Sequence, residues 1–318
     1  MFDVIGIGSV FVDYFFNVDE IILKKNNLKP EDDFLFKEKN IDLKDIFEKP
    51  LILDKSPGGI SLNTIAVLGA LNRKVSFCGL IGKDKNARYF LNNLKKVDKS
   101  HLIKIGKMSR CFCFLSHNRK RRTFLSEVNP NDNDFFKKID LNFLNTARFI
   151  HVGPFLSDSK EILKNIEGIF NKIKRPLISF SPGIRYINFG LKTLLPLFKK
   201  TYVLFLNEQE TKRLTKKNVE EGSKYLLNYG IKIIVCTMGK NGAMATTKKE
   251  QIFEKGIKIK KVVDPTGAGD SFAAGFLYGL LNNKSLKESL ILANKIASKS
   301  VSDFGLRWLK DIKELKLT

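Results

Sequence analysis

Short apolar runs alternate with longer amphipathic stretches through most of this chain of 318 residues. The alternation is typical of βα units, in which helices join the strands of a mainly parallel sheet. It predicts strands at residues 4–8, 75–81, 149–152, 177–180, 203–206, 231–237 and 243–247. It predicts helices at residues 62–71, 87–94, 160–173, 208–214, 219–229, 271–281 and 286–301. An α/β fold is therefore expected, and the 43% hydrophobic content allows it a large core.

Two segments interrupt this alternation. Residues of about 21–50 are highly charged with scattered Phe and Leu, a composition typical of a solvated surface loop. Residues 110–127 have the pattern of a β-hairpin that turns near residues 117–120. The basic run at the tip of this hairpin, residues 118–122, is expected to be a solvated turn or a clamp on an anionic group of a substrate.

The chain carries 56 Lys and Arg against 33 Asp and Glu, a formal net charge of +23. An excess of this size raises the alternative of a non-catalytic nucleic-acid-binding protein. Here the basic residues are spread from end to end, and Lys, Asn, Ile and Phe are all plentiful. This composition is expected from an AT-rich genome, so we predict no specific nucleic-acid partner. Anionic substrates would still be attracted.

The four cysteines lie in apolar runs and lack the paired C-x-x-C spacing of zinc and redox sites. Buried free thiols in a reducing cytoplasm are expected. Cys111 and Cys113 would point to the same face of a strand, so a metal or disulfide role for this pair is the alternative. The N-terminus begins with a core strand instead of a signal peptide, and no apolar run is long enough to span a bilayer. We therefore expect a cytoplasmic protein with no membrane partner.

The segment 262–276 places a turn of small residues and a carboxylate between an apolar strand and an apolar helix. Gly267, Ala268 and Gly269 allow backbone N–H groups to point at one position, and the helix expected from Ser271 adds its positive dipole end there. Asp270 adjoins this anion site and could accept the proton of a hydroxyl group. The alternative is a tight turn followed by a helix cap. We favour phosphoryl transfer.

A second segment, residues 56–71, places the pair Gly58 and Gly59 before a helix that carries Asn63 in its first turn. This segment and residues 262–276 resemble the two signatures of the ribokinase-like (PfkB) family of sugar and nucleoside kinases. The resemblance spans almost the whole chain. It implies a three-layer α/β/α sandwich in a single domain, residues 1–318, with a mostly parallel central sheet and a small β lid. The lid excursions would lie at about residues 12–50 and 100–127.

The resemblance also implies roles for individual residues. Acceptor hydroxyls would be bound by Asp13, Gly58, Gly59 and Asn63. The nucleotide would be bound by Asn207, Glu210, Thr237, Gly239, Gly242 and Asn294. Glu210 would hold Mg²⁺ through water, which suits an ion that keeps several of its waters, and Asp264 would contribute to a monovalent-cation site for K⁺.

The expected activity is therefore transfer of the γ-phosphate of ATP to a hydroxyl group of a sugar, with Asp270 as the base. A nucleoside such as adenosine is the alternative acceptor, because residues 58–63 depart from the form typical of ribokinases. Ser181 occupies a position where many relatives have Asp. No P-loop sequence is present, so the phosphate grip would come from residues 267–269. A homodimer through the lid is a further expectation.

Overall fold

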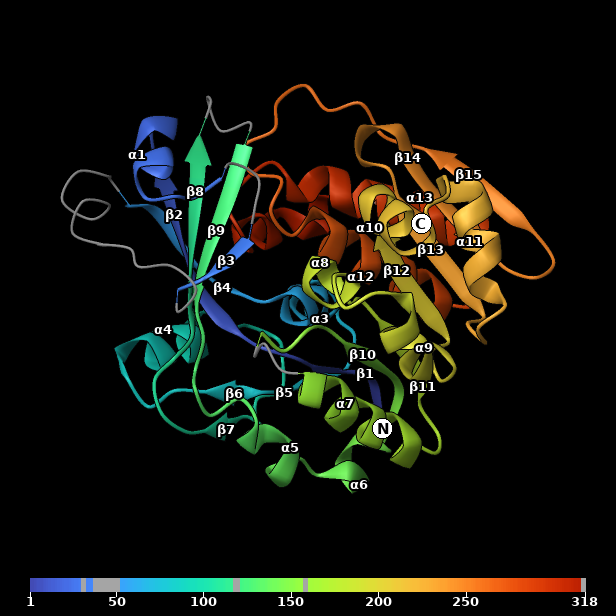
Figure 1. Cartoon of the computed structure of the whole chain (residues 1–318), viewed down its shortest axis with the longest axis horizontal. Coiled ribbons are helices and arrows are strands. Elements are labelled where there is room, and N and C mark those ends of the chain that lie inside the picture. The colour runs from blue at the N-terminus through green and yellow to red at the C-terminus, as the bar shows by residue number, and fades with distance from the viewer. Residues whose placement is uncertain (30–32, 37–51, 117–120, 157–159, 316–318) are drawn as a thin grey trace.

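A computed structural model describes residues 1–29, 33–36, 52–116, 121–156 and 160–315. An eight-stranded sheet with the order β15-β14-β13-β12-β11-β10-β1-β5 forms its centre (Figure 1). All neighbouring strands run parallel except at the edge formed by β14 and β15. The strands are β1 (Phe2–Ile7), β5 (Val75–Cys78), β10 (Ala147–Val152), β11 (Leu177–Phe180), β12 (Val203–Asn207), β13 (Ile233–Thr237), β14 (Gly242–Thr246) and β15 (Gln251–Lys255).

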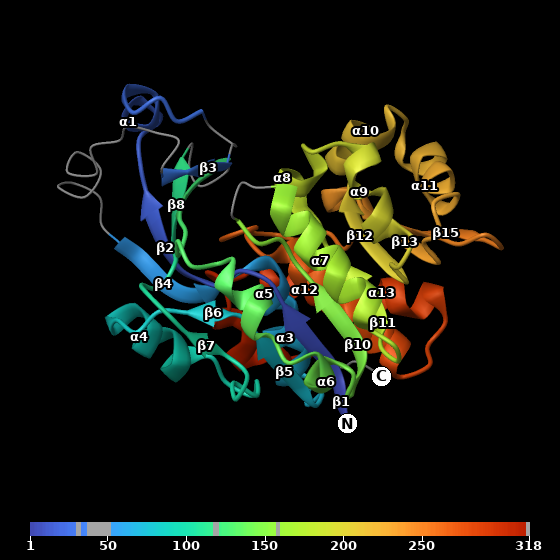
Figure 2. The same ribbon diagram turned by 60° about the horizontal axis from the view of Figure 1, so that its bottom comes forward.

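Both faces of this sheet are buried under helices (Figures 1 and 2). Val203 and Phe205 of β12 pack on one side, and Leu204 and Leu206 pack on the other, as expected when side chains alternate along a strand. One face packs against α3 (Ile60–Ala70), α12 (Ala268–Leu281) and α13 (Leu286–Ser300). The other face packs against α7 (Lys160–Lys172), α9 (Leu191–Phe198), α10 (Glu208–Thr215) and α11 (Val219–Leu227). The expected α/β sandwich is confirmed.

A second, five-stranded sheet stands at the left of Figure 1, and we call it the small sheet. Its strands follow the order β3-β9-β8-β2-β4. They are β2 (Phe11–Asn17), β3 (Asp33–Leu35), β4 (Ile52–Gly58), β8 (Arg110–Ser116) and β9 (Arg121–Glu127). The predicted hairpin of residues 110–127 is confirmed, although its turn at residues 117–120 lies outside the described residues.

The small sheet has two distinct faces. The outer face packs beneath α1 (Glu20–Lys25) in a separate apolar cluster that contains Phe16, Leu23 and Phe112. The inner face carries Asp13 and Cys111, which occupy paired positions on β2 and β8. Of the first excursion, the structure describes α1, which packs on the outer face of the small sheet, and β3, which is one of its strands. β4 continues the small sheet to Gly58, beyond the expected limit at residue 50.

The strand order of the main sheet reverses at β1 and β10. β1 lies between β5, which follows it along the chain, and β10, which comes later. In α/β sheets, ligands bind outside the carboxyl ends of the strands at such a reversal of strand order.

The remaining elements are β6 (Leu80–Ile81), β7 (Ile103–Lys104), α4 (Lys85–Asn93), α5 (Asp134–Lys138), α6 (Leu141–Leu144), α8 (Gly183–Ile187), η2 (Gly239–Asn241) and η3 (Arg307–Glu314).

Candidate active site

The first turn of α12 forms a cradle of backbone N–H groups. The helix begins at Ala268 instead of the predicted Ser271, because Gly267 adopts φ of 74° and serves as its N-cap. The Ala268 N–H donates to the carbonyl of Pro265 at 3.3 Å. The amides of Gly269 and Asp270 have no partner within the helix, since the first N–H groups of any helix lack one. A Cβ atom added at Gly269 would meet no atom within 4 Å, so an anion has room at this turn.

The side chain of Asp270 is held beside this cradle by α3. The amide of Asn63 donates to Oδ2 of Asp270 at 2.8 Å, and the hydroxyl of Thr64 donates to the Asp270 carbonyl at 3.0 Å. Burial raises the pKa of the Asp270 carboxyl to about 7, although the hydrogen bond from Asn63 lowers it. A carboxyl group with this pKa can accept a proton near neutral pH. Only its position next to Asn63 could have indicated the role of Thr64 from the sequence.

Asp13 lies on the inner face of the small sheet, where its side chain is buried. In the part of the chain that the structure describes, no protein group hydrogen-bonds its carboxylate. Burial, followed by the charges of Asp264 and Asp270, raises the pKa of Asp13 to about 8. A buried carboxyl group without a protein partner is suited to a polar ligand, because otherwise its desolvation is not offset.

The two glycines before α3 allow the chain to approach Asp13 closely. A Cβ atom added at Gly58 would lie 1.9 Å from Oδ2 of Asp13, which is impossible without rearrangement. Gly59 has φ of 127°, and a Cβ atom there would lie 2.6 Å from the carbonyl oxygen of Ser9. The structure thus brings together Asp13, Asn63 and Asp270, from segments far apart in the sequence.

Asn207 and Glu210 form a capping box at the start of α10. The side chain of Asn207 accepts from the Glu210 N–H at 2.8 Å, and Oε2 of Glu210 accepts from the Asn207 N–H at 2.9 Å. Burial raises the pKa of Glu210 to about 7, and its charge in turn raises the pKa of Asp270. The charge of Glu210 therefore acts on the Asp270 carboxyl at the start of α12. Thr237 is paired with Asn207 across the neighbouring ends of β12 and β13.

The loop after β13 carries two of the residues predicted to bind the nucleotide, Gly239 and Gly242. A Cβ atom at Gly239 would meet nothing within 4 Å, whereas one at Gly242 would lie 2.1 Å from the carbonyl of Glu254. Gly242 thus allows β14 and β15 to pair closely. The amide of Asn294 donates to the carbonyl of Lys255 at 3.2 Å and fastens α13 to β15. The structure therefore gives Gly242 and Asn294 structural contacts, while Gly239 borders free space.

Asp264 connects two loops near the site. Its Oδ1 accepts from the Thr266 N–H at 2.9 Å, and its Oδ2 accepts from the Gly305 N–H at 3.2 Å. Burial raises the pKa of Asp264, while these hydrogen bonds lower it. Both carboxylate oxygens therefore hold backbone amides in place, and the monovalent-cation role of Asp264 stays a prediction.

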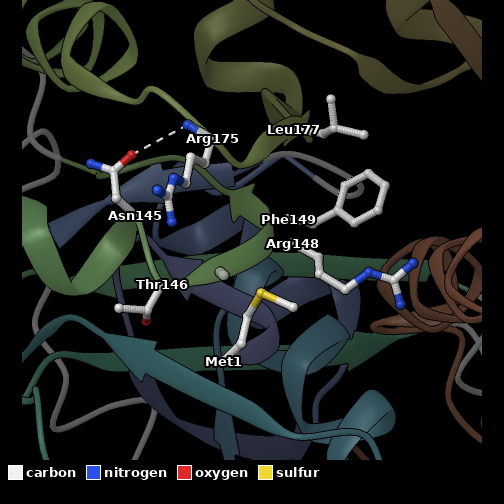
Figure 3. A pocket seen from close by; sticks show the side chains of 8 residues that line it. Met1, Asn145, Thr146, Arg148, Phe149, Arg175 and Leu177 are labelled. Atoms are coloured by element: carbon white, nitrogen blue, oxygen red, sulfur yellow. Dashed lines mark hydrogen bonds between the residues drawn. The ribbon is translucent and has the colours of Figure 1, made fainter.

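A hollow of about 570 Å³ lies at the opposite edge of the sheet (Figure 3). Its walls include the amino ends of β10 and β11. No carboxylate lines it, so it lacks a base for proton transfer. The lining residues are Met1, Asn145, Thr146, Ala147, Arg148, Phe149, Arg175 and Leu177. The group formed by Asp13, Asp264 and Asp270 is therefore the better candidate for an active site.

Comparison with known proteins decides the family. A family model described as pfkB family carbohydrate kinase matches residues 35–310 of this chain. The chain belongs to this pfkB family. This pfkB kinase is therefore a phosphotransferase that acts on hydroxyl groups, which argues against a non-catalytic nucleic-acid-binding protein.

Relatives of this pfkB kinase include proteins named as sugar kinases and as nucleoside kinases. An uncharacterized sugar kinase of Archaeoglobus fulgidus is 28% identical over 76% of this chain and 96% of its own length. A nucleoside kinase of Methanocaldococcus jannaschii is 25% identical over 98% of this chain and 95% of its own. The adenosine kinase structure from Sinorhizobium meliloti superposes with a TM-score of 0.81 at 18% identity, covering 98% and 99% of the two chains. This last likeness supports the ribokinase fold.

None of the described helices has the length and apolar character needed to cross a membrane.

Proposed function

We propose that this kinase transfers the γ-phosphate of ATP to a hydroxyl group of a sugar, and that Asp270 removes the proton from that hydroxyl. One observation carries the proposal: a carboxyl group with a pKa near 7 lies within the helix turn whose amides are available to an anion. Removal of the proton makes the acceptor oxygen a better nucleophile, and the amides of the turn stabilise negative charge on the phosphoryl group.

The surrounding residues fit the two substrates. Asp13 and Asn63 would present a carboxylate and a carboxamide to the hydroxyl groups of the acceptor, and Gly58 and Gly59 allow the backbone to lie close to Asp13. Asn207 and Glu210 would hold Mg²⁺ through water, and the space beside Gly239 would admit the nucleotide. The bound ion would neutralise phosphate charge in the nucleotide.

A nucleoside is the second candidate acceptor, and the inner face of the small sheet supports it. Phe11 and Phe15 flank Asp13 along β2 and belong to an apolar cluster with the half-buried Phe124 and Phe304. Rings of this kind could stack on a nucleobase while Asp13 binds ribose hydroxyls. A sugar uses only the polar part of this surface.

A coupled assay of ADP formation distinguishes the candidates. Ribose, fructose and 2-keto-3-deoxygluconate would be compared with adenosine, cytidine and inosine at equal concentrations. Saturable turnover with a sugar supports the first proposal. Saturable turnover with nucleosides alone selects the second, and failure with every alcohol tested would contradict both.

A further inference from the structure

We propose that Asp13, Cys111 and Cys113 form a binding site for a thiophilic divalent metal ion of the Zn²⁺ type. One carboxylate oxygen and the two sulfur atoms all lie within 4.8 Å of one another. All three side chains lie on the inner face of the small sheet, where β2 and β8 pair. The site includes the carboxylate that is expected to bind the acceptor, and it is separate from the residues expected to hold Mg²⁺.

The distance between the two sulfur atoms fits a tetrahedral ion. The Sγ atoms of Cys111 and Cys113 lie 3.8 Å apart. Two sulfur atoms bound to one tetrahedral Zn²⁺ at about 2.3 Å each are themselves separated by about 3.8 Å. The thiols are therefore already spaced as the ion requires, and Asp13 supplies a third ligand of a type found in zinc sites.

The strand geometry favours a metal ion over a disulfide between these cysteines. Residues two apart on one strand have Cα atoms separated by roughly 6.6 Å, near the upper limit for a disulfide. A metal ion bridges the thiols without drawing the backbone together. The other two cysteines, Cys78 and Cys236, are buried in the main sheet and provide an internal comparison.

The electrostatic surroundings also favour a cation. The charges of Asp264 and Asp270 act on Asp13, so an ion with positive charge would relieve the repulsion among the three carboxylates. Three protein ligands leave a fourth position for water or for a hydroxyl group of a substrate.

Binding of this ion would affect the kinase through Asp13. If the proposed function holds, the metal ion and the acceptor compete for the same carboxylate. At free Zn²⁺ ten times its dissociation constant, the apparent KM for the acceptor should rise about tenfold, with the KM for ATP unchanged.

The direct test uses Cd²⁺ in the absence of nucleotide and acceptor. Titration of the reduced protein in thiol-free buffer should produce a thiolate-to-cadmium charge-transfer band that saturates at one ion per chain. The double variant Cys111→Ala/Cys113→Ala should bind Cd²⁺ at least about a hundredfold more weakly, whereas Cys78→Ala should bind as the wild type does. Asp13→Asn keeps both thiols and should weaken Cd²⁺ binding to a lesser extent. This single variant tests the site if the double variant does not fold.

Two results would overturn the site: absence of the band in the wild type, or equal affinity in the wild type and in the variants of the three ligands. The outcome is independent of the proposed function, because no substrate is present. A protein that binds Cd²⁺ through these thiols but phosphorylates no alcohol would retain the metal site and lose the proposed function.

Discussion

At the scale of single residues, the protonation of Asp270 should set the lower pH limit of activity. Its pKa is raised to about 7, and a base must be deprotonated to act. The value of kcat/KM should therefore fall roughly tenfold per pH unit below pH 7 and level off above it. Initial rates between pH 5 and pH 9 measure this profile. A rate that is unchanged between pH 5 and pH 7 would contradict the assignment of Asp270 as the base.

Asp13 should lower the stability of the ligand-free protein at alkaline pH. Its pKa rises from 3.8 to about 8 on folding, so the native state binds more protons than the unfolded state between these values. The contribution of Asp13 to the free energy of unfolding is therefore fully present at low pH and is lost as the pH rises toward 8. Asp13→Asn should therefore increase the free energy of unfolding more at pH 8 than at pH 4, by up to about 5 kcal/mol.

Urea denaturation of both proteins at the two pH values measures this difference. Asp140→Asn provides the control, because Asp140 is an exposed helix N-cap and Asn caps helices equally well. An equal effect of Asp13→Asn at both pH values would show that Asp13 is not protonated in the native state.

At the scale of elements, the first turn of α12 can be tested with a matched pair of glycine substitutions. A Cβ atom at either Gly269 or Gly168 would meet nothing within 4 Å, and both residues are helical. Gly168→Ala in α7 should stabilise the fold by about 0.5–1 kcal/mol and leave activity unchanged. Gly269→Ala should also fold, but its methyl group would occupy the space intended for phosphate and lower kcat/KM for ATP by at least about tenfold.

Thermal unfolding and steady-state kinetics of the two variants measure these effects. Similar activity in both would mean that the phosphate does not approach the α12 turn. Loss of stability in Gly269→Ala would point to packing at this position instead.

The elements that the sequence predicted best are those with a strong apolar pattern. The strands at residues 177–180 and 203–207 and the helix at residues 286–300 agree with the expected ranges within one residue, because apolar periodicity is strong there. β15 was missed. Its side chains are half-buried or exposed at a sheet edge, and Phe253 is 50% exposed, so the strand has little apolar pattern.

Candidate site residues could be named from the sequence, but their contacts could not. The order of small residues and a carboxylate indicated Asp270, and the family resemblance indicated Asn63 and Asp13. These residues lie close together because α3 packs against α12. A local sequence pattern does not reveal a contact between segments so far apart in the chain. The start of α12 was placed too late because helix periodicity begins only after the residues of the glycine turn.

At the scale of the whole molecule, an ion pair joins the small sheet to the main body. Arg185 of α8 lies 3.3 Å from Asp33 of β3, and both side chains are largely buried. If the small sheet covers the acceptor, Arg185→Gln should weaken this contact and raise the acceptor KM by about two- to fivefold. Release of phosphate in the absence of acceptor should rise by a similar factor, because water gains access.

Arg110→Gln is the matched control, since Arg110 pairs with Glu127 within the small sheet. Its kinetics should remain close to those of the wild type. If Arg185→Gln alters neither the acceptor KM nor the acceptor-free release of phosphate, the small sheet does not act as a cover.

Proton removal by Asp270 is tested most directly by the turnover number of Asp270→Asn. The substitution keeps the shape of the side chain and removes the base. We predict that kcat falls by about a hundredfold or more while the affinity for ATP, measured by calorimetry, remains within about threefold of the wild type. Asp140→Asn, at a helix start distant from the site, should retain full turnover. Turnover of Asp270→Asn close to that of the wild type would contradict the assignment of this carboxylate as the base.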